Sequence, residues 1–421
     1  MKRRNFLIGA GAALGAAALA RPGTQGNGGH DAYFQSLSVT LAKEGLARPT
    51  MIIDLDRLDA NIDVLRSYIN GPLDYRIVAK SLPSAGLIDY ISRRANSRRL
   101  MVFHQPFMND LARKQPAADM LVGKPMPVAA AARFYDHLDS GGFDPARQLQ
   151  WLIDTPERLD EYAALAQGRD TPVNVNIEID VGLHRGGMTD LNSFAEMLNM
   201  IEAAPNLSFS GLMGYDAHVS KMPTLMGWQA REFQNVQNRY QGFLDVVTSL
   251  HGSTDGLTLN AGGSPTYQLY KGNSRVNEVA AGSGLVKALD FDIPTLADHQ
   301  AALFIATPVL KAEGNTRIPG VPGLGNLMAA WNPNRTQTFF IYGGFWKARA
   351  VSPAGLIENP LYGHSTNQEI LNGSKRVALG VNDYVFMRPT QSEFVMLQFG
   401  DIVAMRGGQI EGVWPTLEQV A

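Results

Sequence analysis

Short apolar runs alternate with helix-like segments over the first two thirds of the chain. Eight runs are β-rich and short enough to be buried strands, and most are separated by stretches with the apolar spacing of amphipathic helices. About eight βα units in succession predict a closed (β/α)8 barrel, because each strand then has a helix to cover it. An open doubly wound sheet is less favoured, since no Gly-x-Gly-x-x-Gly motif follows the first run. The runs are Thr50–Asp56, Tyr75–Lys80, Arg99–His104, Asp119–Gly123, Leu149–Asp154, Val173–Asp180, Ser208–Tyr215 and Leu257–Ala261.

The pattern changes after about residue 295, where long helical patterns become scarce. A stretch dense in Gly, Pro and Asn, Asn315–Asn334, reads as a loop or an excursion of the chain. We therefore expect a barrel domain over residues 45–295 and a mostly β domain over residues 296–421. The β-rich runs of the second domain are Ala301–Leu310, Thr336–Gly344, Lys375–Leu379, Asp383–Arg388 and Asp401–Trp414.

The first 26 residues are typical of a targeting signal and a linker. Lys2-Arg3-Arg4 precedes a Gly/Ala-rich apolar run that ends at Ala18-Leu19-Ala20, an A-x-A cleavage pattern. The run is too short and too weakly apolar to serve well as a membrane anchor. We expect export through the twin-arginine machinery to the periplasm, a route that suits a protein that takes up a cofactor before it leaves the cytoplasm.

Composition excludes several classes of function. The formal net charge is −2, with no long basic or acidic block, so nothing favours binding to nucleic acid or to a membrane surface. The chain has no cysteine, which excludes disulfides and thiolate chemistry.

Lys80 ends a run that reads as an interior strand. Lysine is rarely buried without a partner, and the ends of parallel barrel strands are where active sites lie. Burial there would lower the pKa of the amine and allow it to form a Schiff base. The alternative is a lysine that merely extends from a strand end into solvent.

Two small-residue segments follow later in the chain, Gly262-Gly263-Ser264 and Gly282-Ser283. A Gly-Gly-Ser turn exposes backbone N–H groups to an anion, and loops after late barrel strands commonly bind phosphate. Either segment alone could be an ordinary tight turn. Beside a lysine able to form a Schiff base, the two together indicate a phosphorylated aldehyde cofactor, pyridoxal phosphate.

Several ordered motifs resemble those of the fold type III pyridoxal-phosphate enzymes, which have an alanine-racemase-like N-terminal barrel. Within these the chain is most similar to the D-threonine aldolase and D-serine dehydratase branch, over about residues 48–414. The motifs are Thr50–Ile62, Lys80, Glu178-Ile-Asp180-Val-Gly-x-His-Arg185, Tyr215-x-x-His218, Ala261–Thr266, Glu278-x-x-x-Gly282-Ser283 and Gly400–Trp414.

The resemblance implies a role for each matching residue. Lys80 would carry the cofactor, Arg185 would contact its ring and phenolic oxygen, and Tyr215 and His218 would face the substrate. A histidine titrating near neutral pH suits removal of a proton from a β-hydroxyl group, so Lys80, Tyr215 and His218 are the catalytic residues that we expect. The phosphate would bind at Gly262, Gly263, Ser264, Gly282 and Ser283.

One departure from the family pattern concerns metal binding. In this branch the C-terminal domain supplies a His-x-Cys or His-x-Asp pair of divalent-metal ligands, but here Gln391 and Glu393 occupy those positions. Glutamine is a weak neutral ligand, so a zinc site of the usual kind is not expected. Gln391 and Glu393 stay as weak candidates for a harder cation, and Glu393 could instead accept a proton.

The sequence thus predicts a periplasmic pyridoxal-phosphate lyase that cleaves a D-3-hydroxyamino acid by an aldol reaction, with a homodimer implied by the resemblance. Racemisation and dehydration of D-serine use the same cofactor and stay open as alternatives. A protein that binds the cofactor or an amino acid without catalysis is a further alternative.

Overall fold

In the computed structural model the chain divides into two compact units, each built from separated stretches of sequence. The barrel unit comprises Ile53–Leu303, Gln391–Ala404 and Gly412–Ala421, and the sheet unit comprises Met1–Ile52, Phe304–Thr390 and Met405–Glu411. The structure describes residues 21–69, 71, 73–139, 141–272 and 275–419. Most of the predicted export signal, residues 1–20, lies outside these ranges. In the described part of the chain, no helix has the length and apolar character needed to cross a membrane.

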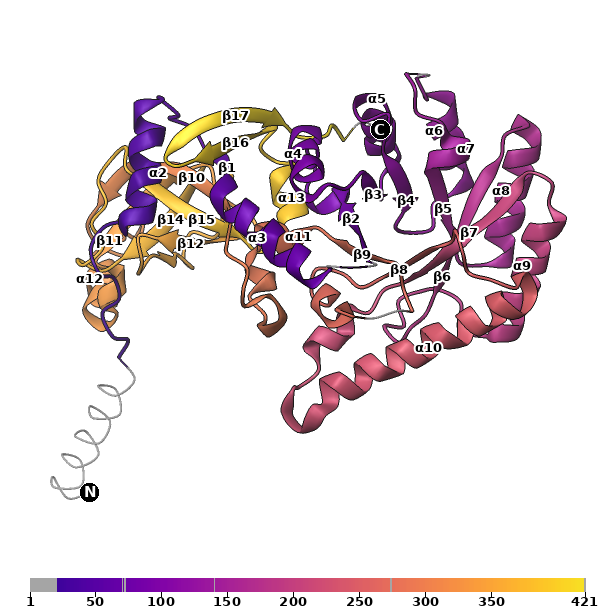
Figure 1. Cartoon of the computed structure of the whole chain (residues 1–421). Coiled ribbons are helices and arrows are strands. Elements are labelled where there is room, and N and C mark those ends of the chain that lie inside the picture. The colour runs from indigo at the N-terminus through magenta and orange to yellow at the C-terminus, as the bar shows by residue number, and fades with distance from the viewer. Residues whose placement is uncertain (1–20, 70, 72, 140, 273–274, 420–421) are drawn as a thin grey trace. The chain divides into compact units, whose positions relative to one another are not determined.

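Eight parallel strands close the barrel, which confirms the predicted fold class (Figure 1). Consecutive strands pair in order, and the last pairs with the first, so that Ile77 of one strand lies opposite Ala281 of the other. Side chains from all eight strands contribute to the barrel core. The strands are β2 (Asp74–Val78), β3 (Arg99–Val102), β4 (Asp119–Val122), β5 (Leu149–Ile153), β6 (Val173–Ile179), β7 (Leu207–Gly214), β8 (Thr258–Ala261) and β9 (Glu278–Ala281).

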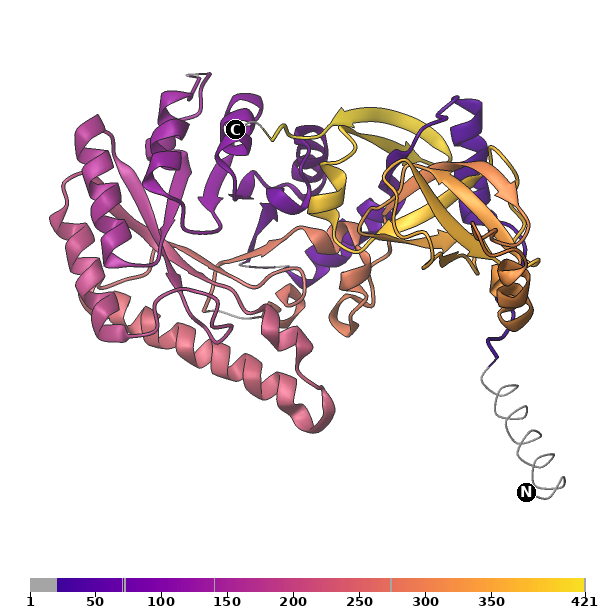
Figure 2. The same ribbon diagram turned by 180° about the vertical axis from the view of Figure 1, so that it is seen from behind.

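Helices between the strands surround the barrel, as the view from behind also shows (Figure 2). Helix α4 illustrates how local sequence sets their bounds: the Ser84 side chain accepts from the Leu87 N–H at its start, and Asn96 ends it in the left-handed conformation, with φ of 52°. The helices of the barrel unit are α3 (Leu55–Tyr68), α4 (Ala85–Ala95), α5 (Gln105–Lys114), α6 (Val128–Asp136), α7 (Pro145–Gln148), α8 (Pro156–Arg169), α9 (Leu191–Ala203), α10 (Trp228–His251), α11 (Ser283–Val286) and α13 (Ser392–Met396).

The prediction of which run opens the barrel was wrong. The run at Thr50 forms β1 (Thr50–Asp54), which lies between β10 and β16 in the other sheet. The eighth barrel strand is instead β9, read from the sequence as part of a small-residue loop. Both β1 and β9 are fully buried, so periodicity could not assign either to its sheet. As a result, Gly262 follows the seventh barrel strand and Gly282 the eighth.

A nine-stranded sheet forms most of the sheet unit, in the order β13-β14-β11-β10-β1-β16-β17, with β15 pairing both β10 and β12. Two predictions were wrong here: Lys375–Leu379 is not a strand, and the expected loop Asn315–Asn334 contains helix α12, because its apolar core Leu324–Trp331 lacks proline. The remaining elements are α2 (Ala32–Lys43), α12 (Leu324–Trp331), β10 (Leu303–Glu313), β11 (Gln337–Tyr342), β12 (Ala348–Ser352), β13 (Ile357–Glu358), β14 (Gln368–Gly373), β15 (Tyr384–Pro389), β16 (Asp401–Arg406) and β17 (Gln409–Pro415).

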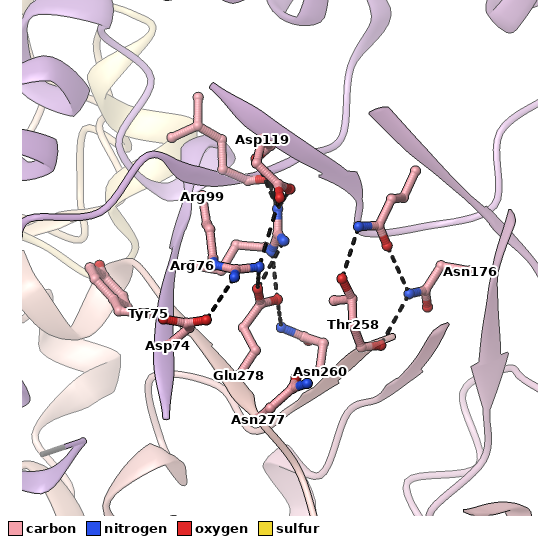
Figure 3. A network of polar contacts seen from close by, with 12 residues as sticks. Asp74, Tyr75, Arg76, Arg99, Asp119, Asn176, Thr258, Asn260, Asn277 and Glu278 are labelled. Carbon is pink, nitrogen blue, oxygen red and sulfur yellow. Dashed lines mark hydrogen bonds and ion pairs between the residues drawn. The ribbon is translucent and has the colours of Figure 1, made fainter. Parts of the chain in front are cut away.

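A buried ionic network joins the first and last barrel strands (Figure 3). The fully buried Arg76 of β2 donates to both carboxylate oxygens of Glu278 on β9, at 2.5 and 2.8 Å, and to Asp119 at 2.9 Å. Glu278 also accepts from Arg99 at 3.1 Å and from Asn260 at 2.7 Å. Burial alone would lower the pKa of Arg76, but the carboxylates of Glu278 and Asp119 raise it. The guanidinium therefore stays charged inside the barrel.

We predict that Arg76→Met destabilises the barrel severely. The change leaves the charge of Glu278 buried without its main partner, and breaking a buried ion pair costs about 3–5 kcal/mol. Urea unfolding followed by circular dichroism measures the loss. Arg93→Met is the matched control, because Arg93 pairs with Asp89 at 3.0 Å on the surface. This variant should lose less than about 1 kcal/mol of its free energy of unfolding. Equal losses in the two variants would contradict the prediction.

Candidate active site

One cavity of about 150 Å³ in the barrel unit brings together most of the predicted site residues. Its wall is built at the C-terminal ends of the strands, from Val78 of β2, Gly214 of β7 and the segments that follow β8 and β9. Active sites of barrels lie on this face. The predicted residues that line it are Lys80, Arg185, Tyr215, Gly262, Gly263, Ser264, Gly282, Ser283, Gln391 and Glu393.

Lys80 lies in a 3-10 turn, Ala79–Ser81, just after β2 rather than in the strand itself. Its Nζ is 3.7 Å from Oε2 of Glu393 and 4.7 Å from the centroid of the Phe103 ring. The Lys80 side chain is 41% exposed, so the desolvation expected at the end of a buried strand is not observed. The turn nevertheless directs the amine into the cavity, where a small molecule can reach it.

The two glycine-serine loops are held together by a side chain. Ser264 Oγ accepts from the backbone N–H groups of Gly282 at 3.0 Å and Gly284 at 2.9 Å. Within the described residues, no hydrogen bond uses the backbone N–H of Gly263, Ser264 or Ser283. Buried or half-buried N–H groups need an acceptor. The joined loops therefore offer donors to an anion in the cavity.

Glycine is required at two places in these loops. A Cβ atom on Gly263 would lie 2.5 Å from Cε2 of Tyr215, and one on Gly282 would lie 2.8 Å from the carbonyl oxygen of Val78. Both distances are below 3.0 Å, closer than a Cβ atom comes to another heavy atom in a folded protein. The loops can therefore approach the ends of β7 and β2 only because they carry no side chain there.

Asp216 fixes the first loop to the end of β7, a role that was not predicted from the sequence. Its buried carboxylate accepts from Oγ1 of Thr266 at 2.6 Å and from the hydroxyl of Tyr270 at 2.7 Å. Burial raises the pKa of Asp216, while these two hydrogen bonds favour its ionised form. The carboxylate thus positions the segment that carries Gly262–Ser264. A short polar residue directly after Tyr215 was the only signal in the sequence.

Arg185 and Tyr215 form another part of the wall. The Arg185 guanidinium lies 4.9 Å from the centroid of the Tyr215 ring, a cation–π contact. Burial raises the pKa of the Tyr215 hydroxyl, so it is neutral at physiological pH. In the turn that leads to Arg185, Asp180 accepts from the Gly182 N–H at 2.8 Å and contacts Nδ1 of His184 at 2.7 Å. His184 is thus a hydrogen-bonded residue of the turn.

The structure does not bring His218 into the cavity, contrary to its expected role as the base. It lies in the 3-10 turn Ala217–Lys221, and its Nε2 is 3.1 Å from Oε1 of Glu232 on α10. The turn begins directly after the anchored Asp216 and directs the imidazole toward α10. His218 is absent from the cavity wall, whereas its neighbour Tyr215 is part of it.

Gln391 and Glu393 reach the cavity from the start of helix α13. Oε2 of Glu393 lies 3.5 Å from Oγ of Ser81, in addition to its contact with Lys80. Over the described residues, no group of three or more His, Cys, Asp or Glu side chains is arranged to hold a metal ion. Glu393 lies beside Lys80 on the cavity wall.

Comparisons with known proteins identify the family of the barrel domain. The family model for the alanine racemase N-terminal domain matches residues 53–289. A 3-hydroxy-D-aspartate aldolase from Paracoccus denitrificans (strain Pd 1222) is 23% identical over 278 residues, which are 62% of this chain and 65% of the relative. The chain thus spans just under two thirds of that relative. An alanine racemase from Chlorobaculum tepidum is 29% identical over 103 residues, 24% of this chain and 26% of the relative.

Solved structures share the fold. A D-threonine aldolase from Filomicrobium marinum superimposes with a TM-score of 0.68 at 13% identity, covering 87% of this chain and 94% of the other. D-threo-3-hydroxyaspartate dehydratase from Delftia sp. HT23 superimposes with a TM-score of 0.65 at 17% identity. This match covers 88% of this chain and 98% of the dehydratase chain. At such low identity these likenesses establish the fold alone.

Glu178 is a titratable group beside the site that the cavity does not include. It lies near the end of β6, where burial and the neighbouring Asp154 raise its pKa to about 7, while Arg185 opposes the shift. Because the folded pKa exceeds the unfolded one, the folded protein binds more protons between about pH 4.5 and pH 7. The stability contributed by neutral Glu178 is therefore lost as the pH rises through that window.

We predict that Glu178→Gln stabilises the protein more at pH 8 than at pH 5. Glutamine keeps the shape of glutamate but has no charge to bury. The free energy of unfolding of the variant, relative to that of the native protein, should therefore increase by on the order of 2 kcal/mol from pH 5 to pH 8. Urea unfolding at both pH values measures it. Glu157→Gln, on the surface at the start of α8, is the control and should show no such growth. An equal effect of Glu178→Gln at both pH values would contradict the prediction.

Proposed function

Because the chain belongs to the family of the alanine racemase N-terminal domain, whose members use pyridoxal phosphate, we propose that it cleaves a D-3-hydroxyamino acid by a retro-aldol reaction. One observation carries the proposal: Lys80, the two glycine-serine loops and the Arg185–Tyr215 pair converge on a single cavity. A relative found by sequence and named as an aldolase of 3-hydroxy-D-aspartate supports the reaction type.

The residues present fit the cofactor. Lys80 would bind its aldehyde carbon, and the unused N–H groups of Gly263, Ser264 and Ser283 would receive its phosphate. Arg185, stacked on Tyr215, would contact the ring. When bound, pyridoxal phosphate supplies an electron-accepting ring that stabilises negative charge at Cα of an amino acid.

The cleavage needs a group that accepts the proton of the β-hydroxyl. His218 is paired with Glu232 outside the cavity, and the neutral Tyr215 hydroxyl is a poor acceptor because burial raises its pKa. We assign this step to Glu393, whose carboxylate lies on the cavity wall. As the Cα–Cβ bond breaks, the β-oxygen becomes the carbonyl of the aldehyde product. Lys80 is the group proposed to return a proton to Cα, which leaves glycine.

Racemisation is the second candidate, favoured by the aligned segment of the alanine racemase from Chlorobaculum tepidum. It would require proton transfer at Cα alone. Dehydration of a D-3-hydroxyamino acid would instead expel the β-hydroxyl and retain the Cα–Cβ bond. The products separate the three reactions.

We predict that the protein reconstituted with pyridoxal phosphate absorbs in the visible region and converts D-threonine to glycine and acetaldehyde. Lys80→Ala should lose the visible band and the activity, because the amine that binds the aldehyde is gone. Lys114→Ala, which removes a surface lysine paired with Asp110 at 2.7 Å, should keep both. Absorbance spectra and product analysis by chromatography measure the outcome.

Other outcomes would contradict parts of this proposal. A protein that stays colourless after reconstitution contradicts the cofactor assignment. Interconversion of D- and L-alanine without cleavage would indicate a racemase, and formation of a 2-oxo acid a dehydratase. A coloured protein that turns over no amino acid in a panel of both stereoisomers would be a binding protein.

We also propose that the protein is exported to the periplasm by the twin-arginine route. It rests on Arg3-Arg4 and the apolar run that follows. We predict that the full-length protein appears in the periplasmic fraction of a Gram-negative host, and that changing both arginines to lysine retains it in the cytoplasm. Fractionation and immunoblotting measure this, with a Sec-exported protein as control. Equal distribution of the two forms would contradict the assignment.

A further inference from the structure

The charged side chains on the cavity wall differ in whether they already have a role in binding the cofactor or a contact with another side chain. Among the described residues they are Lys80, Arg185 and Glu393. Lys80 is assigned to the cofactor, and the Arg185 guanidinium lies over the Tyr215 ring. Glu393 is the anionic side chain among the three, and it has no proposed role in binding the cofactor. Its carboxylate contacts Lys80 at 3.7 Å and is available to a substrate bound at that lysine.

The position of Glu393 is fixed relative to the place where a substrate binds. Its Oε2 is 3.7 Å from Nζ of Lys80 and 3.5 Å from Oγ of Ser81. The preceding residue, Ser392, is fully buried, and its Oγ lies 3.5 Å from Oγ of Ser283 in the second loop. Helix α13 is thus held against the loop and against the turn that carries Lys80. Because the proposed function assigns Glu393 to the proton of the β-hydroxyl, the substituents on Cβ of a substrate bound at Lys80 would lie close to this carboxylate.

We propose that Glu393 determines substrate specificity by excluding amino acids whose side chain carries a carboxylate. Like charges a few ångströms apart in a partly buried site repel strongly, and an uncompensated charge is an effective means of rejecting a ligand. The Glu393 side chain is 37% exposed, which weakens this repulsion by solvent screening without abolishing it. The preferred substrates are D-3-hydroxyamino acids with neutral or cationic side chains. This inference rests on the proposed function and narrows its substrate class.

The proposal separates this chain from the relative that it resembles in sequence. That protein is named for 3-hydroxy-D-aspartate, a dicarboxylic amino acid. Of the two cations on this cavity wall, Lys80 is assigned to the cofactor and the Arg185 guanidinium lies over the Tyr215 ring, 4.9 Å from its centroid. A net preference for neutral ligands therefore depends on the charge of Glu393.

The test compares D-aspartate with D-asparagine, which have nearly the same shape but differ in charge and lack a β-hydroxyl to be cleaved. Dissociation constants are measured on the cofactor-loaded protein from the change in its absorbance, at pH 7.5 and low salt. The native protein should bind D-asparagine about tenfold or more tightly than D-aspartate, as expected for a difference of one like charge nearby. Glu393→Gln should reduce this ratio at least about fivefold, mainly by improving the binding of D-aspartate.

Two further variants make the test specific. Glu393→Arg reverses the charge and should favour D-aspartate over D-asparagine. Glu196→Gln removes an exposed carboxylate on α9, outside the cavity, and should leave the ratio as in the native protein. Circular dichroism of each variant confirms folding, and calorimetric titration with the same two amino acids replaces the absorbance measurement if no cofactor colour develops.

Several outcomes would overturn the proposed role of Glu393 in substrate specificity. An unchanged ratio in Glu393→Gln, an equal loss of both ligands, or the same change in Glu196→Gln would overturn the inference. A native protein that binds neither ligand by calorimetry would overturn it as well. If the ratio shifts as expected while D-threonine is not cleaved, the specificity assignment stands and the proposed aldol reaction fails.

Discussion

The buried pairing of Arg76 with Glu278 is the interaction on which the site depends most. Arg76 lies on β2, which leads to Lys80, and Glu278 lies on β9, which leads to Gly282 and Ser283. These strands are the first and last of the barrel and pair along its closing seam. Removing two charges from water is costly, so we attribute to the network the specification of strand register more than a gain in stability. A slip at this seam would move Lys80 relative to the second loop.

Side-chain hydrogen bonds extend this order from the strands to the loops. Asp216 anchors the segment after β8 to the end of β7, and Ser264 joins that segment to the backbone after β9. The N–H groups available to an anion are therefore positioned before any ligand binds. Such preorganisation matters because donors that need not reorient keep their full electrostatic effect. The loops are short, and close backbone approach at Gly263 and Gly282 keeps them near the strand ends.

The sequence predicts the barrel and most of the cavity wall because these depend on local signals. Apolar runs, strand-end residues and glycine-serine turns can be read within a few residues of one another. The assignment of β1 and β9 failed because the two strands differ in their distant partners, not in their own pattern. The position of His218 outside the cavity could not be predicted for a related reason. The 3-10 turn after Asp216 decides where its side chain points, and this turn has no distinctive composition. Arg76 sits inside an apolar run, where only its partners on other strands explain it.

Glu393 illustrates how the chemistry of such a site can change without any change in the barrel. It comes from Gln391–Ala404, a stretch far along the chain that nevertheless belongs to the barrel unit. Helix α13 contributes side chains to the wall beside Lys80, but it is not part of the closed sheet that positions the lysine and the loops. A substitution at its exposed end alters the charge, proton affinity and ligand preference of the cavity at little cost to folding. The barrel strands thus position the residues proposed to bind the cofactor, and α13 positions the carboxylate proposed to select the substrate.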